Sequence, residues 1–265
     1  MRLIILALVL GLTACETVQT TKPGTVGIER EQRFLVSDQE INQAAAQEYR
    51  KVIADAQAKG KLDRNAQHVQ RVRSILSRMV PHTAAFRPDA RQWGWEIHVI
   101  EDAQLNAWAM PGGKMAVYSG LIEKLRLTED ELAAIMGHEI AHSLREHARE
   151  RVSREMATGI AVGIAGAALG LGDIGQQLAG AVANVTFNLP HSRTHETEAD
   201  RLGVELAARA GYDPHAAISL WQKMTQVGGG GGPQFLSTHP SPESRLADLR
   251  VYADRVMPLY QQARR

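Results

Sequence analysis

The run His138-Glu139-Ile140-Ala141-His142 constrains this chain more than any other stretch. Two histidines four positions apart lie on one face of a helix, about one turn from each other, so both imidazoles can reach one ion. Glu139 lies about 100° further around that helix and can stand beside the metal without binding it. A zinc hydrolase needs this combination of two nitrogen ligands and a carboxylate base. Because short motifs also occur by chance, the rest of the chain has to support the metal site.

The residues around this motif predict a capped helix. Thr128 followed three positions later by Glu131 has the form of a capping box. Acidic residues occupy the first turn and Arg145 lies toward the other end, as the helix dipole favours. Four apolar residues recur at helical spacing and predict a buried stripe: Leu132, Ile135, Met136 and Ile140.

The first fifteen residues have the pattern of a secretory signal. Arg2 precedes an apolar run over residues 3–12, which is shorter than the roughly 20 residues that a membrane span needs. The ending Leu12-Thr13-Ala14-Cys15 resembles the bacterial lipobox, so we predict lipidation of Cys15; the alternative is an ordinary signal peptide in which Cys15 is incidental. The next residue is Glu16 and not the Asp that resembles an inner-membrane retention signal, which favours sorting to the outer membrane. Residues 16–36 are rich in Thr, Gly and charge and predict a tether.

Composition limits the remaining possibilities. The 265 residues suit one large domain, here residues 37–265, and the hydrophobic content of 44% can supply a core. A formal net charge of +1 argues against a nucleic-acid binder that works through bulk charge. Cys15 is the only cysteine, so a protein lipidated there forms no disulfide.

The order of expected elements indicates a mainly helical α+β fold. Residues 37–58 and 65–79 predict helices, and the alternation over residues 93–100 predicts a strand. Pro111-Gly112-Gly113 predicts a turn before a second strand at residues 114–118, hence a hairpin. In a peptidase, an edge strand ahead of the HExxH helix can bind an extended substrate, although an ordinary structural hairpin fits the same pattern. Residues 156–187 predict two small-residue helices rather than a membrane span.

A second helix, beginning near residue 191, offers the third ligand. Glu196 and Asp200 are four apart and share a face, so Glu196 can bind the metal while Asp200 accepts the second ring N–H of a ligand histidine. Zinc hydrolases commonly use three protein ligands and leave one position for water. Four nearby residues are expected to be loop, structural or solvated residues rather than ligands: His147, His191, His195 and Glu198.

Four motifs in one order carry a family resemblance. They are the run over residues 106–113, the HExxH motif, the ExxAD motif Glu196-Thr197-Glu198-Ala199-Asp200, and Thr238-His239-Pro240. Across residues 69–249 the chain resembles the HtpX and CAAX prenyl protease class of gluzincin metallopeptidases, especially its periplasmic lipoprotein members. It departs from some of them in having no further cysteine and no room for a C-terminal repeat domain.

The resemblance implies a zincin-like core, with one zinc ion held by His138, His142 and Glu196 and with Glu139 as the base. A small β-sheet would carry a substrate edge strand that includes Asn106, Ala107, Trp108 and Ala109. His239 would close over the metal or steady the oxyanion, the alternative being a turn histidine before Pro240.

The resemblance also implies the biological setting. The expected function is endoproteolysis of misfolded or unassembled polypeptides in the bacterial envelope, by a protein anchored to the membrane through its N-terminal lipid. Envelope assembly machinery is a possible partner, and nucleic acid is not expected. The alternative is a chaperone-like or assembly-factor lipoprotein with a closed or structural zinc site.

Overall fold

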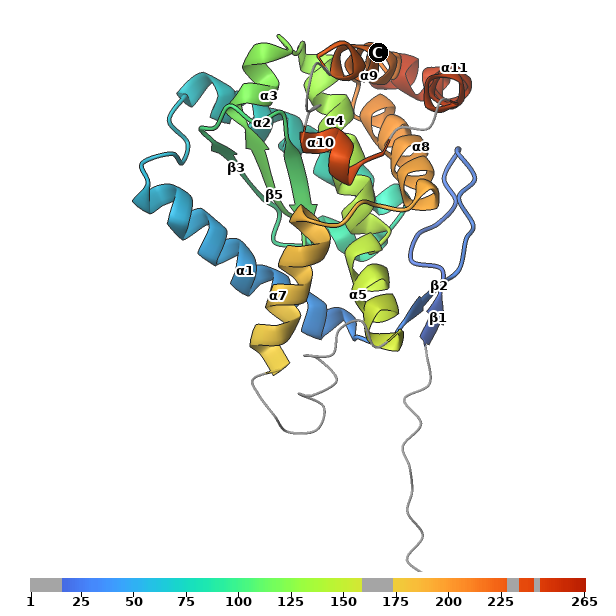
Figure 1. The fold of residues 1–265 in the computed structure, drawn as a ribbon. Helices are drawn as coiled ribbons and strands as arrows, with labels where there is room; N and C mark the ends of the chain where they lie inside the picture. Colours follow the sequence, from blue (N-terminus) through green and yellow to red (C-terminus); the bar gives the residue numbers. More distant parts are fainter. Residues whose placement is uncertain (1–15, 159–173, 228–233, 241–243) are drawn as a thin grey trace, which may run out of the picture.

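A computed structural model describes residues 16–158, 174–227, 234–240 and 244–265 (Figure 1). Three strands and most of the helices surround one long central helix, α4. The elements in chain order are β1 Glu16–Val18, β2 Gln32–Phe34, α1 Asp38–Ala58, α2 Ala66–Met79, the 3₁₀ helices η1 Val80–Ala85 and η2 Pro88–Gln92, β3 Glu96–Ile100, β4 Ala107–Met110, β5 Lys114–Tyr118, α3 Ser119–Lys124, α4 Glu129–Leu144, α5 His147–Ala157, α7 Ile174–Phe187, α8 Arg193–Arg209, α9 Ala216–Gln226, α10 Gln234–Thr238 and α11 Arg245–Ala263.

The larger sheet has the strand order β3-β5-β4. Strand β3 runs parallel to β5, whereas β4 and β5 form an antiparallel hairpin in which Ala107 lies opposite Val117. The turn between them contains Gly112 and Gly113, both with positive φ, where a side chain would be strained. The hairpin predicted from Pro111-Gly112-Gly113 is confirmed, and β4 lies at the edge of the sheet.

The two faces of this sheet pack against different helices. Val99, Met115 and Val117 point into the main core with α2, α4 and α8. Trp108 and Ala116 point to the opposite face, into a second cluster with α1 and α7. This alternation is the period-two pattern of a strand, here with both faces covered. The fold is therefore mainly helical α+β, as predicted.

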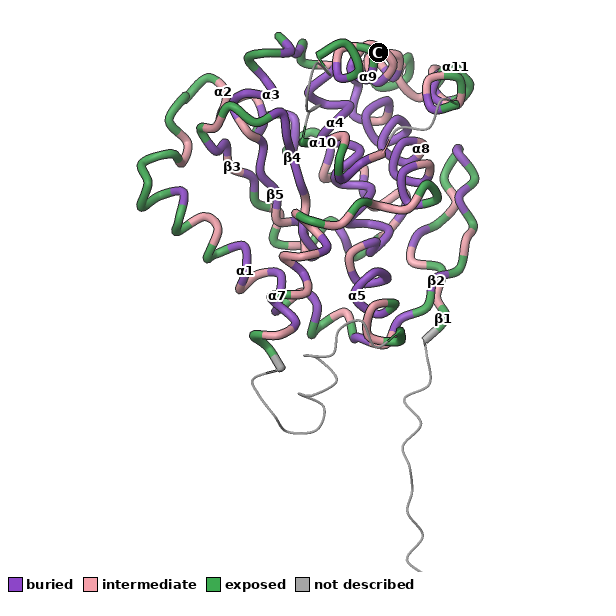
Figure 2. The backbone as a smooth tube through the Cα atoms, in the orientation of Figure 1, coloured by how far each residue is buried: buried purple, intermediate pink, exposed green. Residues whose placement is uncertain are grey.

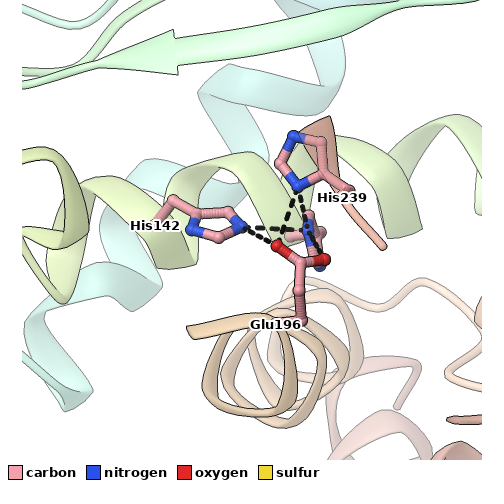
Figure 3. Close-up of side chains that lie close together, drawn as sticks. His142, Glu196 and His239 are labelled. Carbon is pink, nitrogen blue, oxygen red and sulfur yellow. Dashed lines mark hydrogen bonds and ion pairs between the residues drawn. The ribbon is translucent and has the colours of Figure 1, made fainter. Parts of the chain in front are cut away.

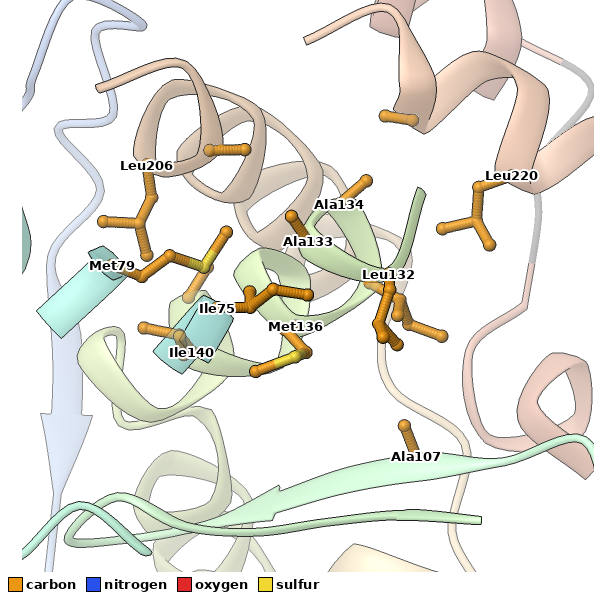
Figure 4. Close-up of a cluster of buried hydrophobic side chains, with 14 of the residues drawn as sticks. Ile75, Met79, Ala107, Leu132, Ala133, Ala134, Met136, Ile140, Leu206 and Leu220 are labelled. Carbon is orange, nitrogen blue, oxygen red and sulfur yellow. The ribbon is translucent and has the colours of Figure 1, made fainter. Parts of the chain in front are cut away.

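Helix α4 lies at the centre of the main core (Figure 4). Its capping box is formed as predicted: the Thr128 side chain accepts from the Glu131 backbone, and the Glu131 side chain accepts from the Thr128 backbone. Every residue from 131 to 144 is buried (Figure 2), so all faces of the helix are covered and not only the predicted stripe. The helix ends at Leu144, and Glu146, at φ 50°, turns the chain into α5.

Residues 16–36, which we call the N-terminal strap, do not form the predicted tether. Strands β1 and β2 pair antiparallel, and the side chains of Val26, Ile28 and Phe34 are almost completely buried. The Gln32 side chain donates to the Arg145 carbonyl at 2.6 Å, at the end of α4. The prediction of a tether rested on the polar composition of residues 16–36, which does not reveal that a few apolar and hydrogen-bonding residues fix the segment to the core. The predicted signal and Cys15 lie outside the described residues.

Helix α7 corresponds to the second of the two small-residue helices predicted over residues 156–187. It packs against α1 through Leu178 and Val182. The first predicted helix falls on residues 159–173, outside the described ranges. Within the part of the chain that the structure describes, none of the helices combines the length and the apolar character needed to cross a membrane.

Candidate metal centre

Two crossing helices supply the potential metal ligands. His138 and His142 lie on α4, and Glu196 lies in the first turn of α8, whose N-cap Ser192 accepts from the His195 backbone. The helices approach closely because glycine faces glycine where they cross: a Cβ built on Gly137 would lie 2.8 Å from the Gly203 carbonyl oxygen. The predicted second ligand helix is therefore present and is held directly against the first.

The three predicted ligands converge. Figure 3 shows His142 and Glu196 pointing toward one another and toward His239. The Nε2 atoms of His138 and His142 are 3.0 Å apart. Glu196 Oε1 lies 3.4 Å from His142 Nε2, and Glu196 Oε2 lies 3.6 Å from His138 Nε2. All three side chains are buried, with exposures of 5% or less.

His239 completes a group of four donors that lie within 4.8 Å of one another. It follows α10, and its Nδ1 is 3.2 Å from His138 Nε2 and 3.0 Å from Glu196 Oε1. Its Nε2 faces Glu139 Oε1 at 3.5 Å. Burial opposes charging of this ring, but the carboxylates of Glu196 and Glu139 leave the pKa of His239 raised. The structure thus places His239 at the fourth side of the cluster, between the ligands and Glu139.

The chemistry of this donor set fits a cation. His138 Nδ1 faces the Asp200 carboxylate at 3.0 Å and donates to it, so His138 Nε2 carries a lone pair. That lone pair points toward a cluster of further acceptors, and Glu196 Oε2 is buried there without a hydrogen bond from the described residues. Although Glu196 Oε2 is ion-paired with Arg245 at 3.1 Å, four buried donors of electron pairs within 4.8 Å of one another are costly unless a cation lies among them. The cluster fits one catalytic zinc ion.

Glu139 lies beside the cluster without joining it. The side chain is almost fully buried, and its Oε1 has no hydrogen-bond partner among the described residues. Burial raises the pKa of Glu139, although His239, His138 and a backbone hydrogen bond from Ala109 oppose the shift. A raised pKa makes this carboxylate a better proton acceptor than an exposed glutamate.

An arginine that the sequence did not reveal supports the metal ligands. Arg245 donates to Asp200 Oδ1 at 2.6 Å, and its second terminal nitrogen lies 3.1 Å from Glu196 Oε2. Its guanidinium lies over the Trp221 ring, 3.3 Å from the centroid. Arg245 is the first residue of α11 and no metal-site motif includes it, so only the fold shows that it fixes both acidic residues.

The residues predicted to bind substrate lie on or beside the edge strand β4. The Asn106 carbonyl accepts from the Tyr118 backbone, so in the antiparallel ladder the backbone groups of Ala107 and Ala109 point away from β5. The Asn106 side chain accepts from the Ala107 backbone at 3.0 Å. The Trp108 side chain is buried on the face of the sheet that packs against α1 and α7, where it lines a recess together with Val185.

Four polar residues around the site were predicted as loop, structural or solvated residues: His147, His191, His195 and Glu198. Three of them are at most 4% exposed, and His191 is half-buried. The His191 ring stacks on His239, with 4.9 Å between centroids. Burial lowers the pKa of both His147 and His191 well below the usual value. Solvation is therefore excluded for Glu198, which lies inside a network of ion pairs.

The fold and the site together define a class of protein. An HExxH helix crossed by a helix that brings in a glutamate, beside a small sheet whose edge strand is β4, is the core of a gluzincin-type metallopeptidase. The sequence matches peptidase family M48 over residues 66–253. The chain belongs to this family.

Curated relatives include enzymes of mitochondria and of bacteria. The chain is 40% identical to the mitochondrial metalloendopeptidase OMA1 of Schizosaccharomyces pombe over 160 residues. This matched stretch covers 60% of this chain and 46% of the relative. It is 32% identical over 182 residues to the human OMA1 metalloendopeptidase, a stretch that covers 64% of this chain and 34% of the human protein. It is 28% identical over 201 residues to the beta-barrel assembly-enhancing protease of Yersinia pestis, covering 71% and 40%. The chain thus spans less than half the length of these three relatives.

Proposed function

We propose that this chain is a zinc-dependent endopeptidase. The observation that carries the proposal is the position of Glu139, a buried carboxylate that stands beside a complete His-His-Glu donor set without belonging to it. A structural zinc site has no use for such a group, whereas a hydrolase needs a base there. A bound zinc ion supplies a Lewis acid that polarises the scissile carbonyl and lowers the pKa of water.

The residues of this chain then divide the work. His138, His142 and Glu196 hold the ion, and Asp200 fixes the ring of His138 through its Nδ1–H. Glu139, buried beside the donor set, takes the proton of the attacking water and passes it to the leaving amine.

The edge strand β4 is the proposed binding site for the substrate backbone. Because the carbonyls of Ala107 and Ala109 point away from β5, they can accept main-chain hydrogen bonds from an extended peptide, while the N–H groups of the same residues bond to Asn106 and Glu139 in this structure. Ala109 also contacts Glu139, so a peptide bound there lies next to the base. Main-chain recognition of this kind tolerates many side chains, which suits unfolded polypeptides.

His239 is proposed as the residue that controls access. A catalytic zinc site keeps one position open, and His239 Nδ1 lies within reach of that position. Substrate therefore has to displace His239 from the cluster. Its Nε2 faces Glu139 at 3.5 Å, and a displaced ring that keeps this contact would be placed to donate to the developing oxyanion.

Replacing Glu139 by Gln tests the enzyme proposal. We expect casein cleavage by the zinc-loaded protein to fall about 10²–10⁴-fold, the range of general acid–base catalysis, while the zinc content stays at one ion per chain. Glu101→Gln is the control for the same chemical change, because Glu101 is exposed beside Arg64 and is not one of the clustered donors. Undiminished cleavage by the Glu139→Gln variant would refute the proposal.

The proposed setting is the bacterial envelope, with the protein lipidated at Cys15 and facing the periplasm from the outer membrane. The lipobox-like ending and the likeness to a beta-barrel assembly-enhancing protease support this setting. Its substrates would be misfolded or unassembled envelope proteins, and assembly machinery a partner. A Cys15→Ala variant should lose labelling by radioactive palmitate in cells, and labelling equal to that of the parent would exclude lipidation at Cys15.

The second candidate is a chaperone-like or assembly-factor lipoprotein with a closed zinc site. The four-donor group favours it, because four protein ligands are typical of structural zinc. The two candidates differ in what a cell needs from Glu139. If the Glu139→Gln variant restores a deletion strain as fully as the parent does, the binding function is the one that matters.

A further inference from the structure

The ring of His142 has a second contact, on the side away from the metal donors. Its Nδ1 lies 2.8 Å from Nδ1 of His147, the first residue of α5. Nε2 of His147 in turn lies 3.0 Å from Glu198 Oε2. A chain of two short contacts thus leads from His142 to a carboxylate on α8.

The chemistry of these contacts assigns each proton, given the proposed function, in which His142 Nε2 binds zinc. His142 Nδ1 must then carry the hydrogen and donates it to His147 Nδ1. His147 therefore accepts at Nδ1 and carries its own hydrogen on Nε2, from which it donates to Glu198. His147 thus uses one ring nitrogen as an acceptor, at 2.8 Å from His142, and the other as a donor, at 3.0 Å from Glu198.

Glu198 is itself held in place from two directions. Arg145 Nε, fully buried, donates to Glu198 Oε2 at 2.9 Å. Arg30 Nε, from the N-terminal strap, donates to Glu198 Oε1 at 2.6 Å. The carboxylate is therefore a fixed anchor, and it lies two residues from Glu196 on the same helix.

We propose that His147 and Glu198 are positioning residues, which orient the zinc ligand His142 through a histidine-to-histidine relay. The two ligand histidines are thus held differently: His138 donates directly to the carboxylate of Asp200, whereas His142 reaches Glu198 through the intervening ring of His147. Outer partners of this kind fix both the tautomer and the orientation of a ligand ring.

The experiment compares His147→Leu with His195→Leu. Both histidines are buried and their rings stack, with 4.2 Å between centroids. The His195 ring lies 3.2 Å from Glu150, and neither of its nitrogens makes a hydrogen bond among the described residues, so it is outside the relay. We expect His147→Leu to weaken zinc binding about 10–100-fold in a competition titration against a chelator, and His195→Leu to leave it within about threefold. In the cobalt-substituted protein, the visible absorption bands should shift for His147→Leu alone.

Equal zinc affinity of His147→Leu and the parent, or an equal loss in His195→Leu, would overturn the proposal. His147→Asn keeps an acceptor near the Nδ1 position but cannot reach Glu198, so its zinc affinity should lie between those of the parent and His147→Leu. If the leucine variant does not fold, His147→Asn decides, and parental affinity with an unchanged cobalt spectrum refutes the relay. A parent protein that binds no zinc would instead refute the proposed function itself.

Discussion

Replacing Gly203 by Ala should disturb the metal centre without touching a ligand. Gly203 lies where α8 crosses α4, and a Cβ there would lie 2.7 Å from the backbone nitrogen of His138 and 2.8 Å from the carbonyl carbon of Gly137. Ordinary Cβ contacts begin at 3.4 Å, so the helices must separate by about 0.7 Å, the difference between 3.4 and 2.7 Å. The obstructing atoms are backbone atoms of a buried helix, which cannot rotate away.

The size of the effect follows from this separation. Overpacking a close contact costs about 1–3 kcal/mol, and the better helix propensity of Ala returns about 1 kcal/mol, so the free energy of unfolding should fall by up to about 2 kcal/mol. A binding constellation has to be held within about 0.5 Å, and His138 and Glu196 lie on the two helices that separate. Zinc affinity should therefore fall at least about tenfold, equivalent to about 1.4 kcal/mol.

Urea unfolding of the zinc-free protein and a zinc competition titration measure the two effects. Gly180→Ala, on the exposed side of α7, is the matched control, because a Cβ there meets nothing within 4 Å. It should leave zinc affinity unchanged and stabilise the protein by up to about 1 kcal/mol. If Gly203→Ala behaves like Gly180→Ala in both assays, the argument from close helix contact is wrong.

Three further predictions concern an arginine that supports the ligands, the metal itself and the capped start of α4. Arg245→Met should weaken zinc binding about 10–100-fold in the competition titration, because Asp200 and Glu196 lose the cation that fixes them. Removing zinc with a chelator should abolish cleavage and lower the melting temperature, and added zinc should restore both; zinc at 1,000 times its Kd contributes about 4.1 kcal/mol. Burial raises the pKa of Glu131, but hydrogen bonds from Lys223 and from the backbone of the N-cap residue Thr128 outweigh burial and leave that pKa lowered. Its stabilising contribution is therefore complete above the unfolded pKa, about 4.3, and is lost as the pH falls further, so Glu131→Gln should flatten the acid limb of urea-unfolding stability.

Local patterns in the sequence predicted the elements that carry the chemistry. Thr128 and Glu131 define the start of α4 because a capping box involves only residues within one turn. The turn at Gly112 and Gly113 is equally local, and it places β4 beside β5. The four-residue spacing within each ligand helix could be read in the same way.

Contacts between distant segments could not be predicted in this manner. His147 is five residues beyond His142, and its role depends on a break in the helix at Glu146, where φ is positive, and on where α8 places Glu198. Arg245 reaches the site only because α11 packs against α8. Periodicity within one element carries no information about such pairs, so these residues were missed or expected to be peripheral.

The N-terminal strap also has a consequence for the order of folding. Its hydrogen bonds reach partners far along the chain: Gln32 bonds to Arg145, 113 residues away, and Val26 bonds to Glu205, 179 residues away. Closing such large loops costs entropy that only a formed docking surface can offset. The first described segment to be synthesised is therefore among the last to dock, and its arrival completes the burial of the ion-pair network around Glu198.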